Sequence, residues 1–194
     1  MNESITKQYS NLLIQALSQI DETLIKDFIE QLLSLRDKKG TLYICGNGGS
    51  AANAMHMAND FIFGAEPNGN SLNTEALSAN GSVMTCLGND IGYENIFSHQ
   101  LKVKAQPHDM LVVLSGSGNS KNILNALEQA NSIRMKSVAI VGFDGGKAKS
   151  IANTVFHTNI NDMQIAEDMQ LIIGHIIMKS LFVTLSNKKG STNG

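Results

Sequence analysis

Three short apolar runs, each leading directly into a loop rich in glycine, place the strongest constraint on how this chain folds. They are Thr41–Cys45, Met110–Leu114 and Ser137–Val141. None of them alternates apolar and polar residues as a half-exposed strand would, and helical patterns follow the loops. Strands of this kind are typical of a parallel sheet that helices cover on both faces. The pattern therefore predicts a doubly wound α/β fold.

Two weaker strand candidates, Thr74–Leu77 and Thr154–His157, complete a five-stranded, flavodoxin-like parallel sheet. The first 39 residues precede any strand and contain neither proline nor glycine. Their apolar residues recur at three- and four-residue steps, which predicts two helices with a break near Asp21 and Glu22. Such a helical arm needs another apolar surface to cover it, and a partner subunit is a candidate.

The composition excludes several classes of protein. The formal net charge is −2, with 42% hydrophobic residues and no basic stripe, which argues against nucleic-acid or membrane-surface binding. Two cysteines, Cys45 and Cys86, are too few for a disulfide scaffold or a thiolate zinc site. Residues 1–30 lack a signal-peptide pattern, and the apolar stretch Leu171–Leu185 is too short to span a bilayer. We therefore expect a cytoplasmic protein with no nucleic-acid or membrane partner.

The loops Gly46–Ser50 and Ser115–Ser120 each follow a predicted strand and open a helix. Ligands of open α/β sheets bind at the carboxyl ends of the strands, and helix N-termini favour anions. The second loop adds the hydroxyls of Ser115, Ser117 and Ser120. Neither loop has the Lys-Ser/Thr pair of a nucleotide P-loop or the Gly-x-Gly-x-x-Gly fingerprint. The loops therefore predict a site for a monophosphate on a small metabolite. Chain turning and helix capping alone are the alternative.

Histidines and carboxylates form a second candidate constellation. His56 and Asp60 are four residues apart on the helix after the first loop, so they share one helix face. Glu167 and His175 lie in the last long helix, about 12 Å apart along a straight helix. Imidazole and carboxylate groups together suit zinc. A local hydrogen bond for His56 and a core position for His175 are the alternatives.

Taken in order, these motifs resemble the sugar-isomerase (SIS) domain family, and within it the phosphoheptose isomerases. The resemblance rests on Gly46–Ala52, His56, the Gly88-Asn89-Asp90 triplet and the serine loop, and it extends from about residue 40 to 185. It predicts a single SIS domain over residues 40–187, and the helical arm over 1–39, expected to serve oligomerisation, also fits the family. The polar, glycine-containing residues 188–194 are expected to form a flexible tail. The resemblance also implies a homotetramer with active sites at subunit interfaces.

The resemblance implies one zinc ion per subunit, bound by His56, Asp60, Glu167 and His175, with Asp60 and His175 as the acid–base pair. The implied substrate-binding residues are Asn47, Gly48, Gly49, Ser50, Asn89, Asp90, Ser115, Gly116, Ser117, Ser120 and Glu167. Two positions depart from the family pattern. Asp60 stands where the family has glutamate, and Glu167 stands where it has glutamine. The shorter base requires a compensating backbone, a different substrate or a weaker activity.

The expected function is an aldose–ketose isomerase acting on sedoheptulose 7-phosphate through an enediol, which would supply heptose for a surface glycan. One alternative is a non-catalytic module of the same fold, either a sugar-phosphate sensor or a protein-interaction homologue such as a regulator of replication initiation. Another is an isomerase of a different phosphosugar. The histidines and carboxylates favour an enzyme, because a scaffold has no need of metal ligands.

Overall fold

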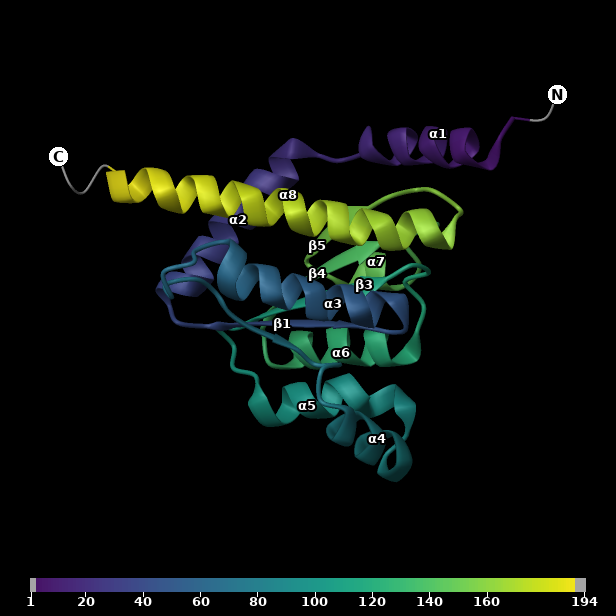
Figure 1. Ribbon diagram of the computed structural model, residues 1–194. Helices are drawn as coiled ribbons and strands as arrows, with labels where there is room; N and C mark the ends of the chain where they lie inside the picture. Colours follow the sequence, from purple (N-terminus) through teal and green to yellow (C-terminus); the bar gives the residue numbers. More distant parts are fainter. Residues whose placement is uncertain (1–2, 191–194) are drawn as a thin grey trace.

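The computed structural model describes residues 3–190, with side chains described to residue 187. Its centre is a parallel sheet of five strands in the order β2-β1-β3-β4-β5 (Figure 1). The strands are β1 (Thr41–Gly46), β2 (Asn73–Ala76), β3 (Met110–Ser115), β4 (Lys136–Val141) and β5 (Thr154–His157). The predicted doubly wound α/β fold is therefore confirmed, and the three strong strand predictions agree with the observed strands to within one residue at each end.

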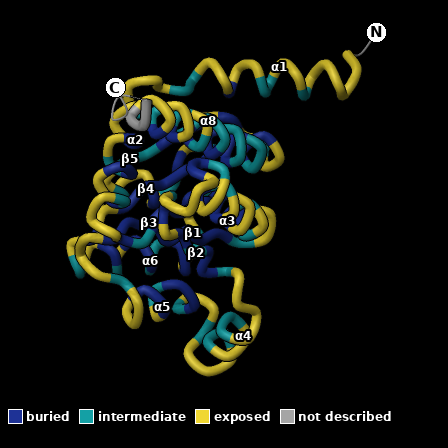
Figure 2. The backbone as a smooth tube through the Cα atoms, turned by 60° about the vertical axis from the view of Figure 1, so that its left-hand side comes forward, coloured by how far each residue is buried: buried dark blue, intermediate teal, exposed yellow. Residues whose placement is uncertain are grey.

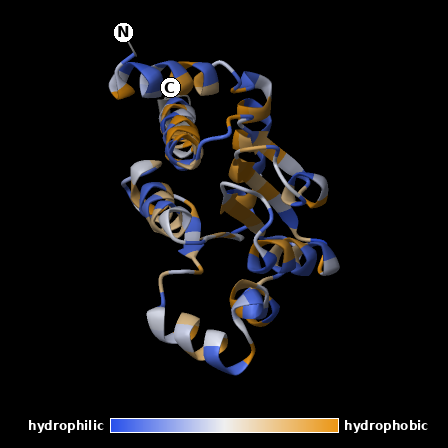
Figure 3. Ribbon diagram, turned by 90° about the vertical axis from the view of Figure 1, so that its right-hand side faces the viewer, coloured by the Kyte–Doolittle hydropathy of each residue, from blue (hydrophilic) through white to orange (hydrophobic). Residues whose placement is uncertain are grey.

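Helices cover both faces of the sheet. They are α1 (Ile5–Leu17), α2 (Glu22–Asp37), α3 (Gly49–Asn59), the π-helical turn η1 (Asp60–Gly64), α4 (Gly81–Asp90), the 3₁₀ turn η2 (Tyr93–Asn95), α5 (Ile96–Lys104), α6 (Lys121–Ser132), α7 (Ala148–Ile151) and α8 (Met163–Gly190). One hydrophobic cluster joins α2, α3 and α8 to one face, and another joins α5, α6 and α7 to the opposite face. In Figure 3 the hydrophobic colour runs through the strands between these layers.

The central strands contribute to both clusters in alternation. Val112 and Leu114 of β3 belong to the cluster under α8, whereas Leu111 and Val113 belong to the cluster under α6. Because both faces are buried, every residue of β3 is apolar except the last. This explains why the sequence shows a continuous apolar run at this position.

The helical arm has the predicted break. The side chain of Asp21 caps α2 by accepting hydrogen bonds from the backbone N–H groups of Thr23 and Leu24. Figures 1 and 2 show α1 beyond the sheet layers, alongside α8. The two helices are joined where Tyr9 donates a 2.5 Å hydrogen bond from Oη to Oδ2 of Asp168. This hydrogen bond is the main cause that raises the pKa of Tyr9 to about 12.

Helix α8 is longer than the apolar stretch that marked it in the sequence. Its length and apolar composition alone would allow it to cross a membrane. However, a residue on every fourth position is buried against the core of the domain, as expected for a core helix. These residues are Ile165, Met169, Ile173, Ile177, Leu181 and Leu185. Of the predicted tail, residues 188–190 continue α8, and residues 191–194 lie outside the described part of the chain.

Candidate active site

The two glycine-containing loops meet at the carboxyl edge of the sheet. Strands β1 and β3 are neighbours, with Gly46 opposite Leu114, so their following loops lie side by side. They enclose a cavity of about 300 Å³. Its lining residues are Asn47, Gly48, Gly49, Ser50, Leu114, Ser115, Gly116, Ser117, Ser120, Met163 and Glu167. The structure therefore brings together nine of the eleven predicted substrate-binding residues.

The remaining two, Asn89 and Asp90, do not line this cavity. They are exposed at the end of α4, where Nδ2 of Asn89 donates a hydrogen bond to Oδ1 of Asp90 at 2.8 Å. Their proposed contact with the substrate therefore stays a prediction.

The serine loop can bind an anion with several groups. Its hydroxyls at Ser115 and Ser117 accept hydrogen bonds from backbone N–H groups of Gly118 and Asn119, which leaves their own protons available to donate. Ser120 is the N-cap residue of the 12-residue helix α6, and its hydroxyl makes no capping hydrogen bond. The unpaired N–H groups at the start of α6 add further donors.

The loop between β4 and α7 holds the serine loop in place. Gly142 and Ala148 donate backbone hydrogen bonds of 2.9 Å to the carbonyl oxygens of Gly116 and Gly118. Gly118 has φ +64°, and a Cβ at this position would clash with the carbonyl oxygen of Gly145. Only glycine fits both constraints, so the shape of the anion site depends on this position.

Removing one hydroxyl should weaken anion binding measurably. In Ser117→Ala and Ser120→Ala we expect each lost hydrogen bond to a charged phosphate to cost about 1.5–3 kcal/mol of binding free energy. Titration calorimetry with a sugar phosphate measures the loss. Ser132→Ala is the matched control, because its hydroxyl bonds to Gln129 at the far end of the same helix. Wild-type affinity in both loop variants would place the phosphate elsewhere.

Three of the predicted metal ligands meet in one cluster. His56 of α3 and His175 of α8 face each other, with 2.9 Å between their Nε2 atoms. Oδ2 of Asp60, the first residue of η1, lies 3.4 Å from Nε2 of His56 and 3.3 Å from Nε2 of His175. The His56 and His175 side chains are nearly half exposed, so a substrate can reach them.

Local structure explains how these side chains converge. Helix α3 widens at Asp60, where Ala65 donates its backbone N–H to the carbonyl oxygen of Asp60 in a π-helical, five-residue step. Such turns occur frequently at functional sites. Helices α3 and α8 also approach closely, because a Cβ on Gly174 would lie only 3.0 Å from Cγ of Met57. The glycine next to His175 therefore permits the contact that brings the two imidazoles together.

The donor set fits a metal ion. Two imidazole nitrogens and a carboxylate oxygen can each offer one ligand atom, and these atoms lie within 4.8 Å of one another. Ligand bonds of about 2.0–2.1 Å in tetrahedral geometry place the ligand atoms about 3.3 Å apart. The observed separations of 2.9 Å to 3.4 Å are close to this value. Three protein ligands also leave one position open, as in catalytic zinc sites.

Glu167 does not join this cluster among the described residues. It lies within α8, two turns before His175, and its carboxylate covers Gly49 at the start of α3, where any Cβ would clash with it. The eight-residue spacing already indicated that both side chains reach one ion only with an irregular helix or a second subunit. Within one chain, Glu167 instead faces the cavity of the glycine loops.

Tyr93 and Asn122 contact the site although no sequence pattern singled them out. Both bond to the amide of Asn47. Tyr93 is 46 residues from Asn47 in the chain, and a lone tyrosine in a short 3₁₀ turn gives no spacing signal. Only the folded chain reveals this contact.

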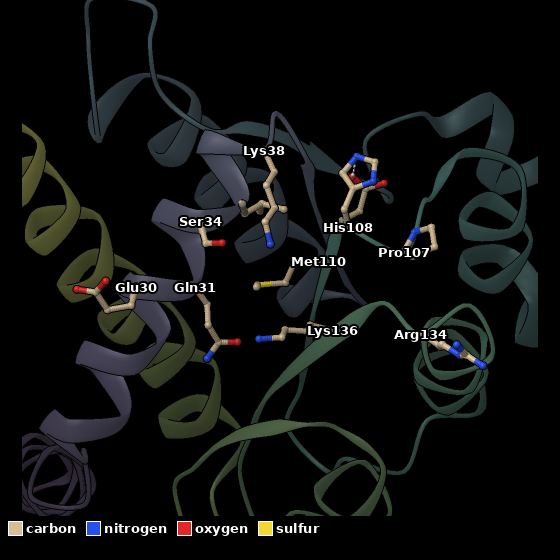
Figure 4. A pocket seen from close by; sticks show the side chains of 11 residues that line it. Glu30, Gln31, Ser34, Lys38, Pro107, His108, Met110, Arg134 and Lys136 are labelled. Atoms are coloured by element: carbon tan, nitrogen blue, oxygen red, sulfur yellow. Dashed lines mark ion pairs between the residues drawn. The ribbon is translucent and has the colours of Figure 1, made fainter.

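A second cavity of about 330 Å³ opens at the opposite edge of the sheet (Figure 4). Two of its cations, Lys38 and Arg134, follow the last turns of α2 and α6, where positive charge complements the helix dipoles, and a third, Lys136, begins β4. The carboxylate of Asp109 accepts backbone hydrogen bonds from Thr41 and Gln106. Because ligands of such sheets bind at the carboxyl edge, the candidate active site is the first cavity.

Comparison with known proteins finds similarity over most of the chain. The SIS domain family model matches residues 7–142. A phosphoheptose isomerase of Helicobacter pylori is 32% identical over 169 residues, which cover 87% of this chain and 88% of the relative. Another, from Sulfurimonas denitrificans, is 39% identical over 141 residues, covering 73% and 71%.

Solved structures show the same architecture. A phosphoheptose isomerase from Neisseria gonorrhoeae superposes with a TM-score of 0.83 at 26% identity, covering 91% of this chain and 96% of that chain. The Vibrio vulnificus NanR protein, solved in complex with ManNAc-6P, superposes with a TM-score of 0.70 at 12% identity, covering 99% and 67%. This second likeness shows the fold alone.

Proposed function

This chain belongs to the SIS domain family, and we infer that it catalyses the aldose–ketose isomerisation of sedoheptulose 7-phosphate. Its relatives at 32% to 39% identity are phosphoheptose isomerases. The observation that carries the inference is the cluster of His56, Asp60 and His175, which lies about two to three turns along α3 and α8, the helices whose first residues line the cavity of the phosphate-binding loops. A sugar phosphate held by its phosphate at the serine loop can extend toward this cluster.

We propose the following division of labour. The serine loop and the N-terminus of α6 bind the phosphate and fix one end of the open-chain sugar. Asp60 and His175 act as the acid–base pair that moves a proton between C1 and C2 through an enediol. Oδ2 of Asp60 and Nε2 of His175 are 3.3 Å apart, so both groups reach the same part of a bound substrate. Glu167 accepts hydrogen bonds from sugar hydroxyls in the cavity that it lines.

His56, Asp60 and His175 would hold a divalent ion, which we propose is zinc because imidazole and carboxylate ligands suit it. When bound, this ion polarises a substrate oxygen and so favours loss of the neighbouring proton. Glu167 completes the ligand set only if assembly or substrate binding moves its carboxylate. The free cysteines Cys45 and Cys86 suit the reducing cytoplasm, where we place the enzyme.

Direct assay tests the function. Purified protein is stripped with a chelator, reloaded with zinc, and incubated with sedoheptulose 7-phosphate while the aldose product is measured. We expect turnover that depends on the metal. Folded, zinc-loaded protein that binds the sugar phosphate without turnover would instead establish a non-catalytic binding module.

We propose that the chain assembles as a homotetramer through α1, α2 and α8. Helix α1 projects beyond the core with exposed Ile5 and Ile14, at 77% and 64% of their accessible surface. Beside it, a mainly apolar groove of about 760 Å³ runs between α2 and α8, lined by Leu17 and Val183 among others. Monomeric proteins rarely expose contiguous apolar patches of this kind, so a second copy of the chain is the proposed cover.

The molecular mass in solution tests the proposed assembly. Light scattering after size exclusion should give about four times the chain mass of 20.9 kDa. Ile14→Glu should shift the protein to smaller species, because it introduces a charge into the proposed interface. Val103→Glu is the control, since Val103 is 70% exposed on α5. A stable wild-type monomer at micromolar concentration would contradict the proposal.

A further inference from the structure

The side chain of Asn47 is part of a hydrogen-bonded network at the rim of the substrate cavity. Asn47 is the first residue after β1, and it lines the cavity. Its Nδ2 donates to Oδ1 of Asn122 at 2.8 Å, and its Oδ1 accepts from Nδ2 of Asn122 at 2.7 Å. Asn122 is only 2% exposed and belongs to the first turn of α6, directly after the serine loop. The pair therefore ties the first loop to the helix that begins at the second.

Tyr93 supplies a third contact to the same amide. Its hydroxyl donates to Oδ1 of Asn47 at 2.9 Å. With hydrogen bonds from Asn122 and Tyr93, both acceptor positions of this oxygen are used. On Nδ2 of Asn47, one of the two hydrogens is bonded to Asn122 and the other is available. The amide of Asn47 therefore presents a donor to a ligand in the cavity.

The segment that carries Tyr93 is anchored to the same helix. Gly92 has φ +88°, a conformation that favours glycine and turns the chain from α4 into η2. On α6, Nδ2 of Asn125 donates to the carbonyl oxygen of Glu94 at 2.9 Å and lies 3.4 Å from Oδ1 of Asn95. Tyr93 and Asn122 thus hold Asn47 from two points that are fixed relative to each other.

We propose that Tyr93 is a positioning residue of the substrate site, which acts through Asn47 rather than on the substrate directly. Its hydroxyl orients the amide of Asn47 so that its free N–H donates to an oxygen of the bound sugar phosphate. Tyr93 is 56% exposed. Its side chain therefore contributes little to the core, and the hydrogen bond of its hydroxyl to Asn47 needs another explanation. This proposal rests on the proposed function, because it names a determinant of substrate binding at that site.

A double-mutant cycle tests the proposal, with the dissociation constant and KM for sedoheptulose 7-phosphate measured in the metal-loaded enzyme. Tyr93→Phe removes only the hydroxyl, and we expect KM and the dissociation constant to rise about two- to tenfold, as for one hydrogen bond. Metal content and unfolding temperature should not change. In the Asn47→Ala background, Tyr93→Phe should have no further effect, because the group through which it acts is gone.

Two results would overturn the proposal. One is wild-type KM in Tyr93→Phe. The other is a double variant whose increase in KM equals the product of the increases in the two single variants. This would mean that Tyr93 contacts the substrate independently of Asn47. Tyr43→Phe is the control, since Tyr43 is buried within β1 and does not line the cavity. Failure of the proposed function is distinguishable, because then the wild-type protein itself shows no turnover.

Discussion

Replacement of His175 by alanine is expected to remove bound metal and isomerase activity together. His175 supplies one of three ligand atoms in the cluster and one member of the proposed acid–base pair. Loss of a positioned acid or base costs about 10²- to 10⁴-fold in rate. The side chain is 43% exposed, so its truncation leaves no sealed core cavity and should change the free energy of unfolding of the metal-free protein by less than about 0.5 kcal/mol.

Three measurements separate these effects. Metal analysis after dialysis gives the bound metal, turnover of sedoheptulose 7-phosphate gives the activity, and unfolding in the presence of chelator gives the stability of the metal-free protein. His56→Ala should behave in the same way. His99→Ala is the matched control, because His99 is an exposed histidine on α5, outside the cluster. If folded His175→Ala protein keeps stoichiometric metal and wild-type turnover, the cluster is not the catalytic centre.

Lengthening Asp60 by one methylene is expected to lower turnover about a hundredfold, although glutamate is the residue that the family resemblance implies at this position. The sequence left two outcomes open, depending on whether the backbone compensates for the shorter side chain. In the structure, Oδ2 of Asp60 already lies 3.3 Å from His175 and 3.4 Å from His56. Asp60→Glu would therefore displace the carboxylate by more than an ångström, and such misplacement costs about this factor in rate.

Turnover and metal content of Asp60→Glu are compared with those of Asp60→Asn, which keeps the length and removes the charge. Asp27→Glu, at an exposed position of α2, controls for an added methylene elsewhere. We expect both Asp60 variants to be impaired, for different reasons. Higher turnover in Asp60→Glu would show that the shorter base is a defect in this chain.

The parts of the fold with strong local patterns were predictable. Buried parallel strands such as β3 are continuous apolar runs, and the break between α1 and α2 carries the capping residue Asp21. Helix α4 was not predicted, because none of its residues is buried and only Met84 and Leu87 pack against the core. The resemblance to a family supplied only the motif Gly88–Asp90 at its end.

Within the site, spacing predicted that His56 and Asp60 share a helix face, and the structure places them together with His175. The position of Glu167 was not predictable from ligand chemistry, because the straight course of α8 decides which loop its carboxylate faces. The contact of Tyr93 with Asn47 depends on the packing of η2 against α6, which no local pattern encodes.

The hydrogen bond between Tyr9 and Asp168 has an evolutionary consequence. Asp168 follows Glu167 on α8, the helix that also carries His175, so the arm is fastened to the helix on which the site is built. A lineage that altered Tyr9 would leave the carboxylate of Asp168 without its donor, and compensating change would be selected on α8. The arm and the catalytic domain are therefore expected to be inherited as one unit rather than exchanged as separate modules.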